Sequence, residues 1–176
     1  MVAFAFILAL FWTSLGRAAG QADELTLKTA FIYNFAKYVE WPVDNPRPRE
    51  EFCIGTLGRP RLDRALASLA GKRIRGKIVV VRRFNSEEEA RNCQILFIDR
   101  SEIVRFEDVA LALEGRHVMT VADSDGFCEA GGMVTLINQD GRITFDINYR
   151  ETQRSGLKVS SQLLKLARKI YGKPRD

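Results

Sequence analysis

The fold is decided by a short apolar run that ends at a glycine, Phe52-Cys53-Ile54-Gly55-Thr56-Leu57-Gly58. A run of this length without polar alternation is typical of a strand that is buried on both faces. Directly after it, apolar residues recur at helical spacing, at Leu62, Ala65, Leu66 and Leu69. A strand followed by a helix is the first half of a βαβ unit, and it predicts a parallel sheet.

Three further apolar runs continue the alternation of strand and helix. We expect strands at residues 78–81, 95–98 and 118–121. A single helical turn at residues 86–90 separates the first two, and a broken helix capped by Ser101 precedes the third. In a doubly wound sheet of order 2-1-3, the strands at 52–57 and 95–98 are neighbours.

The C-terminal third carries a different signal. Residues 133–137 and 143–147 alternate more strongly and are joined by Gln139-Asp140-Gly141, which is a turn sequence. A last helix is predicted from the N-cap Ser160 to about Ile170. The predicted fold is a single three-layer α/β domain, a mainly parallel sheet flanked by helices with a C-terminal antiparallel hairpin at the edge.

Residues 25–41 have the spacing of a helix whose apolar arc is wider than one buried face requires. Such a helix is mostly buried, or it forms part of an interface. Pro42 ends it, and the proline-rich segment Pro42–Arg49 predicts a loop.

The chain has 176 residues, 46% of them hydrophobic and 28% charged, which fits one globular domain. Val2–Leu15 is uncharged and apolar and precedes small residues, so residues 1–22 are predicted to be a signal peptide, although the segment lacks an early Lys or Arg. Cleavage after Ala22 is preferred to cleavage after Ala18. The mature domain, residues 23–176, is then exported to the periplasm and has no stable membrane span.

Export makes the cysteines informative, because neighbouring thiols pair in an oxidising compartment. Cys53 opens one strand and Cys93 immediately precedes its predicted neighbour, so we expect a disulfide between them; two independently buried thiols are the alternative. Closing a loop of this length stabilises a fold by roughly 4 kcal/mol in the chain-entropy model. Cys128 lies in the glycine-rich segment 126–132 and is expected to be a free, accessible thiol.

The sequence contains no recognisable catalytic or metal-binding pattern. The chain has one histidine, His117, with no partner at ligand spacing, so a structural role is expected, with no metal and no cofactor. No nucleophile elbow, Cys/His pair or phosphate-loop lysine occurs, which argues against an enzyme. The basic residues alternate with apolar ones and are interpreted as solvated faces, so no nucleic-acid partner is expected.

Aspartates follow the predicted strands at the end where open α/β sheets bind ligands. These are Asp99, Asp123 and Asp125. A small-ligand crevice lined by Asp99 and Asp123 is one interpretation; helix capping and turn formation explain the same residues equally well.

A family resemblance rests on several motifs that occur in order along the chain. They are the segments Lys28–Pro42, Phe52–Gly55, Cys93–Ile98, Gly126–Met133, Ile147–Asn148 and Gly156–Leu164. Together they span nearly the whole mature chain and resemble the YfiR family.

The resemblance implies a periplasmic regulator that binds the periplasmic sensor domain of an inner-membrane diguanylate cyclase and represses synthesis of cyclic di-GMP. It also implies self-association as a homodimer, and it supports Cys53 and Cys93 as the structural pair. Tyr33 and Phe127 are candidate partner-binding residues, with core packing as the alternative for both. The competing function is a periplasmic small-ligand-binding component of another receptor or transport system.

Overall fold

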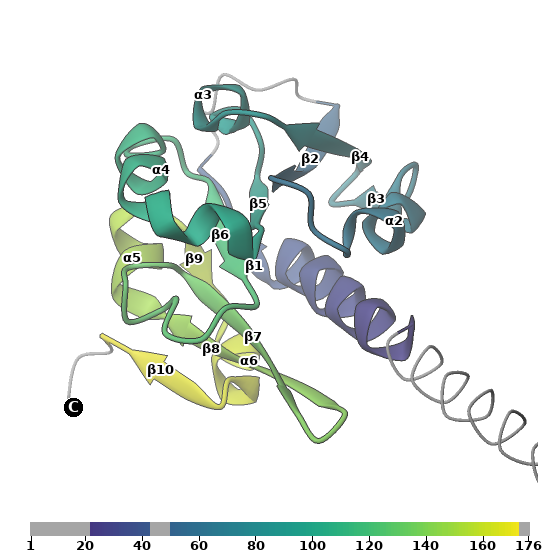
Figure 1. Cartoon of the computed structure of the whole chain (residues 1–176). Coiled ribbons are helices and arrows are strands. Elements are labelled where there is room, and N and C mark those ends of the chain that lie inside the picture. The colour runs from purple at the N-terminus through teal and green to yellow at the C-terminus, as the bar shows by residue number, and fades with distance from the viewer. Residues whose placement is uncertain (1–21, 43–49, 173–176) are drawn as a thin grey trace, which may run out of the picture.

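The computed structural model describes residues 22–42 and 50–172, which contain an eight-stranded sheet and a separate two-stranded ladder (Figure 1). The strands of the large sheet lie in the order β10-β8-β7-β6-β5-β2-β4-β3. Its strands are β2 (Glu51–Leu57), β3 (Arg73–Ile74), β4 (Lys77–Phe84), β5 (Ile95–Ile98), β6 (Met119–Ala122), β7 (Val134–Gln139), β8 (Arg142–Asn148) and β10 (Lys169–Tyr171).

The central strands β4, β2, β5, β6 and β7 are parallel, and β2 lies between β4 and β5. This is the predicted 2-1-3 order, with the first strand in the middle. The order reverses beside β2, and such a reversal opens a crevice at the carboxyl ends of the strands. The backbone topology alone therefore places a crevice at this edge of the sheet, where a ligand can bind.

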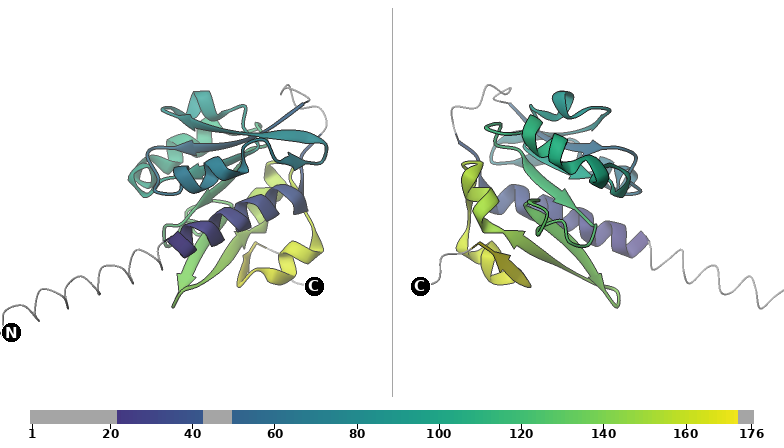
Figure 2. Two further views of the ribbon diagram at one scale, coloured as in Figure 1. Left: turned by 90° about the vertical axis from the view of Figure 1, so that its right-hand side faces the viewer. Right: turned by 60° about the vertical axis from the view of Figure 1, so that its left-hand side comes forward.

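Helices cover both faces of the sheet, as Figure 2 shows from two further directions. One apolar cluster contains Ile32 and Phe35 of the N-terminal helix (22–38) together with Leu66 and Leu163. The other contains Ala90, Phe106 and Val109. The shorter helices are α2 (Asp63–Leu66), α3 (Glu87–Ala90), α4 (Phe106–Ala112), α5 (Tyr149–Arg154), α6 (Ser161–Leu166) and the 3-10 helices η1 (Ala67–Leu69) and η2 (Arg100–Arg105). The predicted three-layer α/β fold is confirmed.

One face of the N-terminal helix is buried in the core. The rings of Phe31 and Phe35 both pack edge-on against Phe145 of β8, at centroid distances of 5.7 and 5.1 Å. Full burial of one such ring stabilises the fold by about 1.5–3 kcal/mol. The helix ends at residue 38, short of the predicted end at Pro42, because Val39–Glu40 form the strand β1, which pairs with β9 (Lys158–Val159).

The β7–β8 hairpin forms where Asp140-Gly141 predicted it. Both turn residues have positive φ, 52° and 84°, as a type I′ turn requires. The short strand β10 runs parallel to β8 and lies outside the hairpin, so it is the outermost strand on that side.

Two further local predictions were wrong. The last helix begins at the predicted cap, Ser160, but ends at Leu166, because the following residues pair with β8: the amide of Arg168 donates to the carbonyl of Phe145. Asp99, not Ser101, caps the helical segment that follows β5, because its carboxylate accepts from the Ser101 amide. In both places a tertiary or side-chain hydrogen bond overrides the local pattern. The predicted signal peptide and most of the proline-rich loop lie outside the described residues.

Candidate functional site

A cavity of about 570 Å³ lies at the carboxyl ends of the parallel strands. Asp99 follows β5, and Asp123 and Asp125 follow β6; all three line the cavity. The loop after β2 contributes Arg61, and the start of the N-terminal helix contributes Lys28. The topology thus brings together residues that are far apart in the sequence.

Lys28 is the one buried cation of the cavity wall within the described residues. Its side chain is 7% exposed, and its ammonium group contacts Asp123 at 2.6 Å and Glu24, one helical turn earlier, at 2.5 Å. Burial alone would lower the pKa of Lys28, but the hydrogen bonds to Asp123 and Glu24 outweigh burial and raise that pKa. The hydrogen bond from Lys28 lowers the pKa of Glu24. Lys28 and Glu24 are therefore both charged at neutral pH.

Lys28 was not among the predicted site residues, because a lysine that interrupts an apolar helix is usually exposed. The signal that could have found it is Glu24, four residues earlier, since opposite charges at this spacing lie on one helix face.

Asp99 has a structural task at the same edge. One of its carboxylate oxygens accepts hydrogen bonds from both the amide and the hydroxyl of Ser101. Ser124, between the two other aspartates, is buried, and its hydroxyl has no hydrogen-bond partner within the described part of the chain. The arrangement offers charged groups for binding, and within residues 22–42 and 50–172 no three His, Cys, Asp or Glu side chains are placed to hold a metal ion.

Cys53 and Cys93 lie on neighbouring segments in one apolar cluster. The amide of Gln94 donates to the carbonyl of Cys53, and the amide of Cys53 donates to Oε1 of Gln94 at 2.6 Å. The Cys93 sulfur lies 3.3 Å from the point where a Cβ on Gly55 would stand. Both sulfurs therefore belong to the same side of the sheet, where Gly55 leaves room for them.

Cys128 is buried, with 1% exposure, so the expectation of an accessible thiol was wrong. The hydroxyl of Thr135 donates to its sulfur at 3.2 Å, and its amide donates back to the Thr135 hydroxyl. Burial raises the pKa of the Cys128 thiol to about 11. The glycine-rich segment folds inward because Asn148 donates a hydrogen bond to the Cys128 carbonyl.

The two candidate contact residues have different surroundings. Tyr33 is half-buried on the N-terminal helix, and the ammonium groups of Lys37 and Lys72 approach its ring at 5.7 and 5.5 Å. Phe127 is 1% exposed and packs against Phe106 at 4.6 Å, so in this conformation its ring belongs to the core.

His117 makes a structural contact. Its Nδ1 lies 2.7 Å from the Ser155 carbonyl and its backbone has a φ of 55°, at the entry to β6. The contact links the start of that strand to the end of α5.

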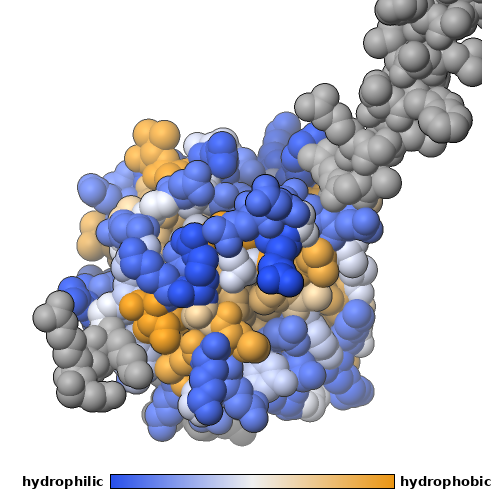
Figure 3. All heavy atoms as spheres, turned by 90° about the horizontal axis from the view of Figure 1, so that it is seen from below, coloured by the Kyte–Doolittle hydropathy of each residue, from blue (hydrophilic) through white to orange (hydrophobic). Residues whose placement is uncertain are grey.

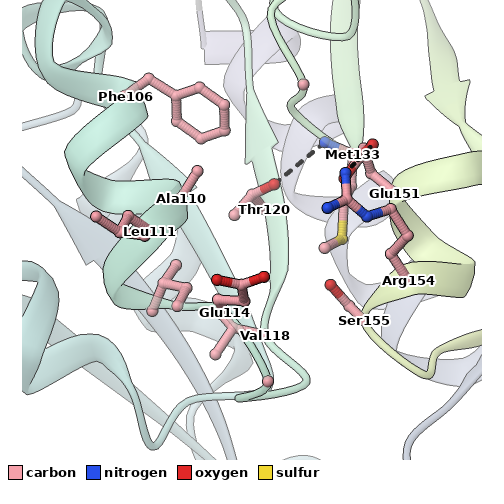
Figure 4. Close-up of a pocket in the computed structure, with 13 residues that line it drawn as sticks. Phe106, Ala110, Leu111, Glu114, Val118, Thr120, Met133, Glu151, Arg154 and Ser155 are labelled. Carbon is pink, nitrogen blue, oxygen red and sulfur yellow. Dashed lines mark hydrogen bonds and ion pairs between the residues drawn. The ribbon is translucent and has the colours of Figure 1, made fainter.

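A second cavity, of about 300 Å³, lies between α4 and α5 (Figure 4). Phe106, Leu111 and Val118 supply its apolar wall, and the ion pair between Arg154 and Glu151 lies at its rim. It is smaller than the strand-end cavity.

The fold defines a doubly wound α/β domain with a charged crevice at its switch point. Residues 25–168 match the YfiR/HmsC-like family model, so the chain belongs to the YfiR/HmsC-like family. Membership supports a periplasmic regulatory role at the level of the family, which is regulatory and not a known enzyme family. The suspected family is therefore confirmed.

Two solved structures are similar in fold. One is a conserved domain protein from Vibrio cholerae O1 biovar eltor str. N16961, with a TM-score of 0.52, 13% identity and coverage of 67% of this chain and 54% of that one. The other is the ABC domain in complex with L-Trp from Streptococcus pneumonia, with a TM-score of 0.49, 12% identity and coverage of 68% and 55%. This chain thus spans about half the length of each.

None of the helices in the described ranges is both long enough and apolar enough to cross a bilayer.

Proposed function

We propose that this protein is exported to the periplasm and represses an inner-membrane diguanylate cyclase by binding the cyclase's periplasmic sensor domain. The observation that carries this proposal is the family match, which runs from the N-terminal helix through α6. Repression requires that the protein bind the inactive conformation of the sensor more tightly than the active one, since a ligand shifts an equilibrium only by its difference in affinity. Cyclic di-GMP then rises when the complex dissociates.

Apolar side chains on the surface provide a place for such contact. Figure 3 shows the face that carries α6 and β10, where apolar and polar side chains lie side by side. Leu166 of α6 is 67% exposed, and Ile170 of β10, four residues later in the sequence, is half-buried. Aliphatic and aromatic groups of this kind commonly anchor protein interfaces. We therefore propose Leu166 as a contact residue, together with Tyr33 on the N-terminal helix.

The proposed export is accompanied by a proposed disulfide between Cys53 and Cys93. Its support is their place in one apolar cluster, with Cys53 as the third residue of β2 and Cys93 two residues before the start of β5. The resemblance to the family also leads us to expect a homodimer. Sedimentation equilibrium of the purified protein, which measures its mass in solution, tests this expectation.

The test measures cyclic di-GMP in a deletion strain and after complementation. Deletion should raise the cellular level of cyclic di-GMP, and complementation with the wild-type gene should return it to the level of the parent strain. Leu166→Glu should restore repression poorly and weaken binding to the purified sensor domain at least tenfold. The matched control is Val104→Glu, because Val104 is a 97% exposed aliphatic residue on η2. Unchanged cyclic di-GMP on deletion refutes the proposed function, and equal binding by both variants refutes the assigned surface.

A second candidate function is a small-ligand-binding component of another receptor or transport system. The observation that favours it is the cavity at the strand ends, lined by Asp99 and Asp123. Loss of uptake or of a sensory response on deletion, with cyclic di-GMP unchanged, would support this candidate over the repressor.

A further inference from the structure

Five basic side chains gather where the hairpin of β3 and β4 meets the end of the N-terminal helix, at the edge of the large sheet, as the left view of Figure 2 shows for the two elements. They are Lys37 of the helix and Lys72, Arg73, Arg75 and Lys77 of the hairpin segment. These five residues are called the basic patch. All of them are exposed except Lys77, which is half-buried.

Tyr33 holds two of the charges close together. The ammonium groups of Lys37 and Lys72 approach its ring centre at 5.7 and 5.5 Å, and its hydroxyl donates to the Arg73 carbonyl at 3.5 Å. Because one ring is in reach of both ammonium groups, the two lysines are neighbours in space although they belong to different elements.

The hairpin turn is fixed against the helix. Arg75 and Gly76 have positive φ, 50° and 80°, which makes the turn between β3 and β4 a tight one. The Nη2 of Arg75 donates to the Lys37 carbonyl at 3.2 Å, in the last turn of the helix, where the carbonyl groups carry partial negative charge. The basic patch is therefore held in place by the fold.

Two carboxylates offset part of the positive charge. Glu40 lies 3.8 Å from Arg75, and because both side chains are exposed this ion pair is weak. Glu50 is exposed and borders the same hollow as Arg73 and Lys77. Five cations against these two carboxylates leave a surplus of three positive charges.

The remaining neighbours do not remove this surplus. Glu51, at the start of β2, is held by Arg82 at 2.9 Å, so that pair is neutral as a whole. The three lysines of the basic patch form no ion pair within the described ranges. Ile78, the next residue of β4, is 42% exposed and lines the same hollow. The basic patch thus combines uncompensated ammonium groups with an exposed aliphatic side chain.

We propose that the basic patch docks the protein on a bilayer that carries anionic headgroups. A lysine is a compact, strongly hydrated charge on a flexible stem, which suits the diffuse potential of a bilayer, whereas recognition of a fixed carboxylate favours the paired hydrogen bonds of arginine. Three of the five cations are lysines. Ile78 enters the headgroup region beside them. The choice of a bilayer rests on the proposed function, which places the protein beside the inner membrane.

The test is sedimentation of the purified protein with lipid vesicles in dilute salt. Vesicles that contain phosphatidylglycerol should bind the protein, vesicles of phosphatidylcholine alone should not, and added salt should weaken binding because the charges are exposed. Each basic residue near an anionic surface contributes about fivefold to binding. Lys37→Gln/Lys72→Gln/Lys77→Gln should therefore weaken binding by roughly a hundredfold.

Two control variants separate the basic patch from net charge. Arg142→Gln/Arg150→Gln/Lys165→Gln removes three charges from exposed positions elsewhere and should bind within about threefold of the wild type. Arginine substituted for the three patch lysines keeps the charge and should also bind within about threefold. Thermal melts establish that each variant is folded.

The outcomes distinguish this inference from the proposed function. Absence of vesicle binding, or equal losses in the glutamine variant and its control, overturns the inference, while the cyclic di-GMP level in the deletion strain tests repression separately. If vesicles do not bind but the glutamine variant binds the purified sensor domain more weakly, the basic patch contacts an acidic protein surface, and the bilayer is the wrong occupant. A glutamine variant that binds vesicles as tightly as the wild type is equally decisive against it.

Discussion

Replacing Lys28 with methionine should destabilise the protein by about 2 kcal/mol at pH 7. The methionine retains the apolar stem but leaves Glu24 and Asp123 facing each other without a cation. Removing one partner of a fully buried ion pair typically costs about 3–5 kcal/mol. The side chains of Glu24 and Asp123 are 28% and 30% exposed, so water solvates part of their charge and the cost is smaller.

Urea unfolding, followed by far-UV circular dichroism and by tryptophan fluorescence, measures this cost. Trp41 is a suitable probe because its indole donates to the Gln94 carbonyl inside the fold. With a typical urea dependence of about 2 kcal/mol per M, the midpoint should fall by roughly 1 M. The control is Lys37→Met on the same helix, because Lys37 is exposed and its ammonium group approaches the rings of Tyr33 and Tyr38.

The effect should depend on pH in a defined direction. The pKa of Glu24 is lowered in the folded protein, chiefly by its hydrogen bond to Lys28, so its contribution is present above the ordinary carboxylate pKa and is lost as the pH falls through the folded pKa. The gap between wild type and Lys28→Met should therefore narrow toward acidic pH. A Lys28→Met protein within about 0.5 kcal/mol of wild type at pH 7, or a gap that widens on acidification, would refute this account of the buried lysine.

Three further outcomes are expected. If Cys53 and Cys93 are bridged, a reducing agent should lower the free energy of unfolding by roughly 4 kcal/mol, and Cys53→Ala/Cys93→Ala should show no further loss on reduction; peptide mass mapping without reductant identifies the bond. Phe127→Ala should cost about 3–5 kcal/mol in urea unfolding because the ring is buried against Phe106, and a cost below 1 kcal/mol would show that the ring leaves the core. Cys128 should resist alkylation in the native state until the pH approaches its raised pKa of about 11, whereas in urea it should react near pH 8–9; rapid native labelling at pH 8 would contradict its burial.

The order of the central strands and the position of the hairpin turn could be predicted from the sequence. The run Phe52–Leu57 and the later apolar runs gave a parallel sheet with β2 beside β5, because a doubly wound topology leaves few alternatives. The turn at Asp140-Gly141 was predictable because only a few residue types tolerate positive φ at both positions.

The strand β10, the role of Lys28 and the burial of Phe127 could not be predicted, because they depend on tertiary contacts that no local sequence pattern encodes. Residues after Leu166 continue a helical pattern, yet they form β10 because Arg168 donates to the Phe145 carbonyl and forms an ion pair with Asp146. Placement of the strand-end aspartates followed from topology, whereas the role of Lys28 required knowing which turn of the N-terminal helix lies over β6. For Phe127 the sequence left a partner contact and core packing open; Gly132, which places no Cβ against the ring, allows the ring to pack inward.

The β1–β9 ladder has a consequence for how the chain is assembled. Val39 pairs with Val159, and the amide of Ser160 donates to the carbonyl of Tyr38, so the earliest described helix is held by residues about 120 positions later. Contacts of such sequence separation form late, because the intervening loop must close first. During synthesis the phenylalanine-rich side of that helix therefore remains uncovered until almost the entire polypeptide has been made. A chaperone that covers this side of the helix before folding is complete would bind the same surface that is buried in the folded protein.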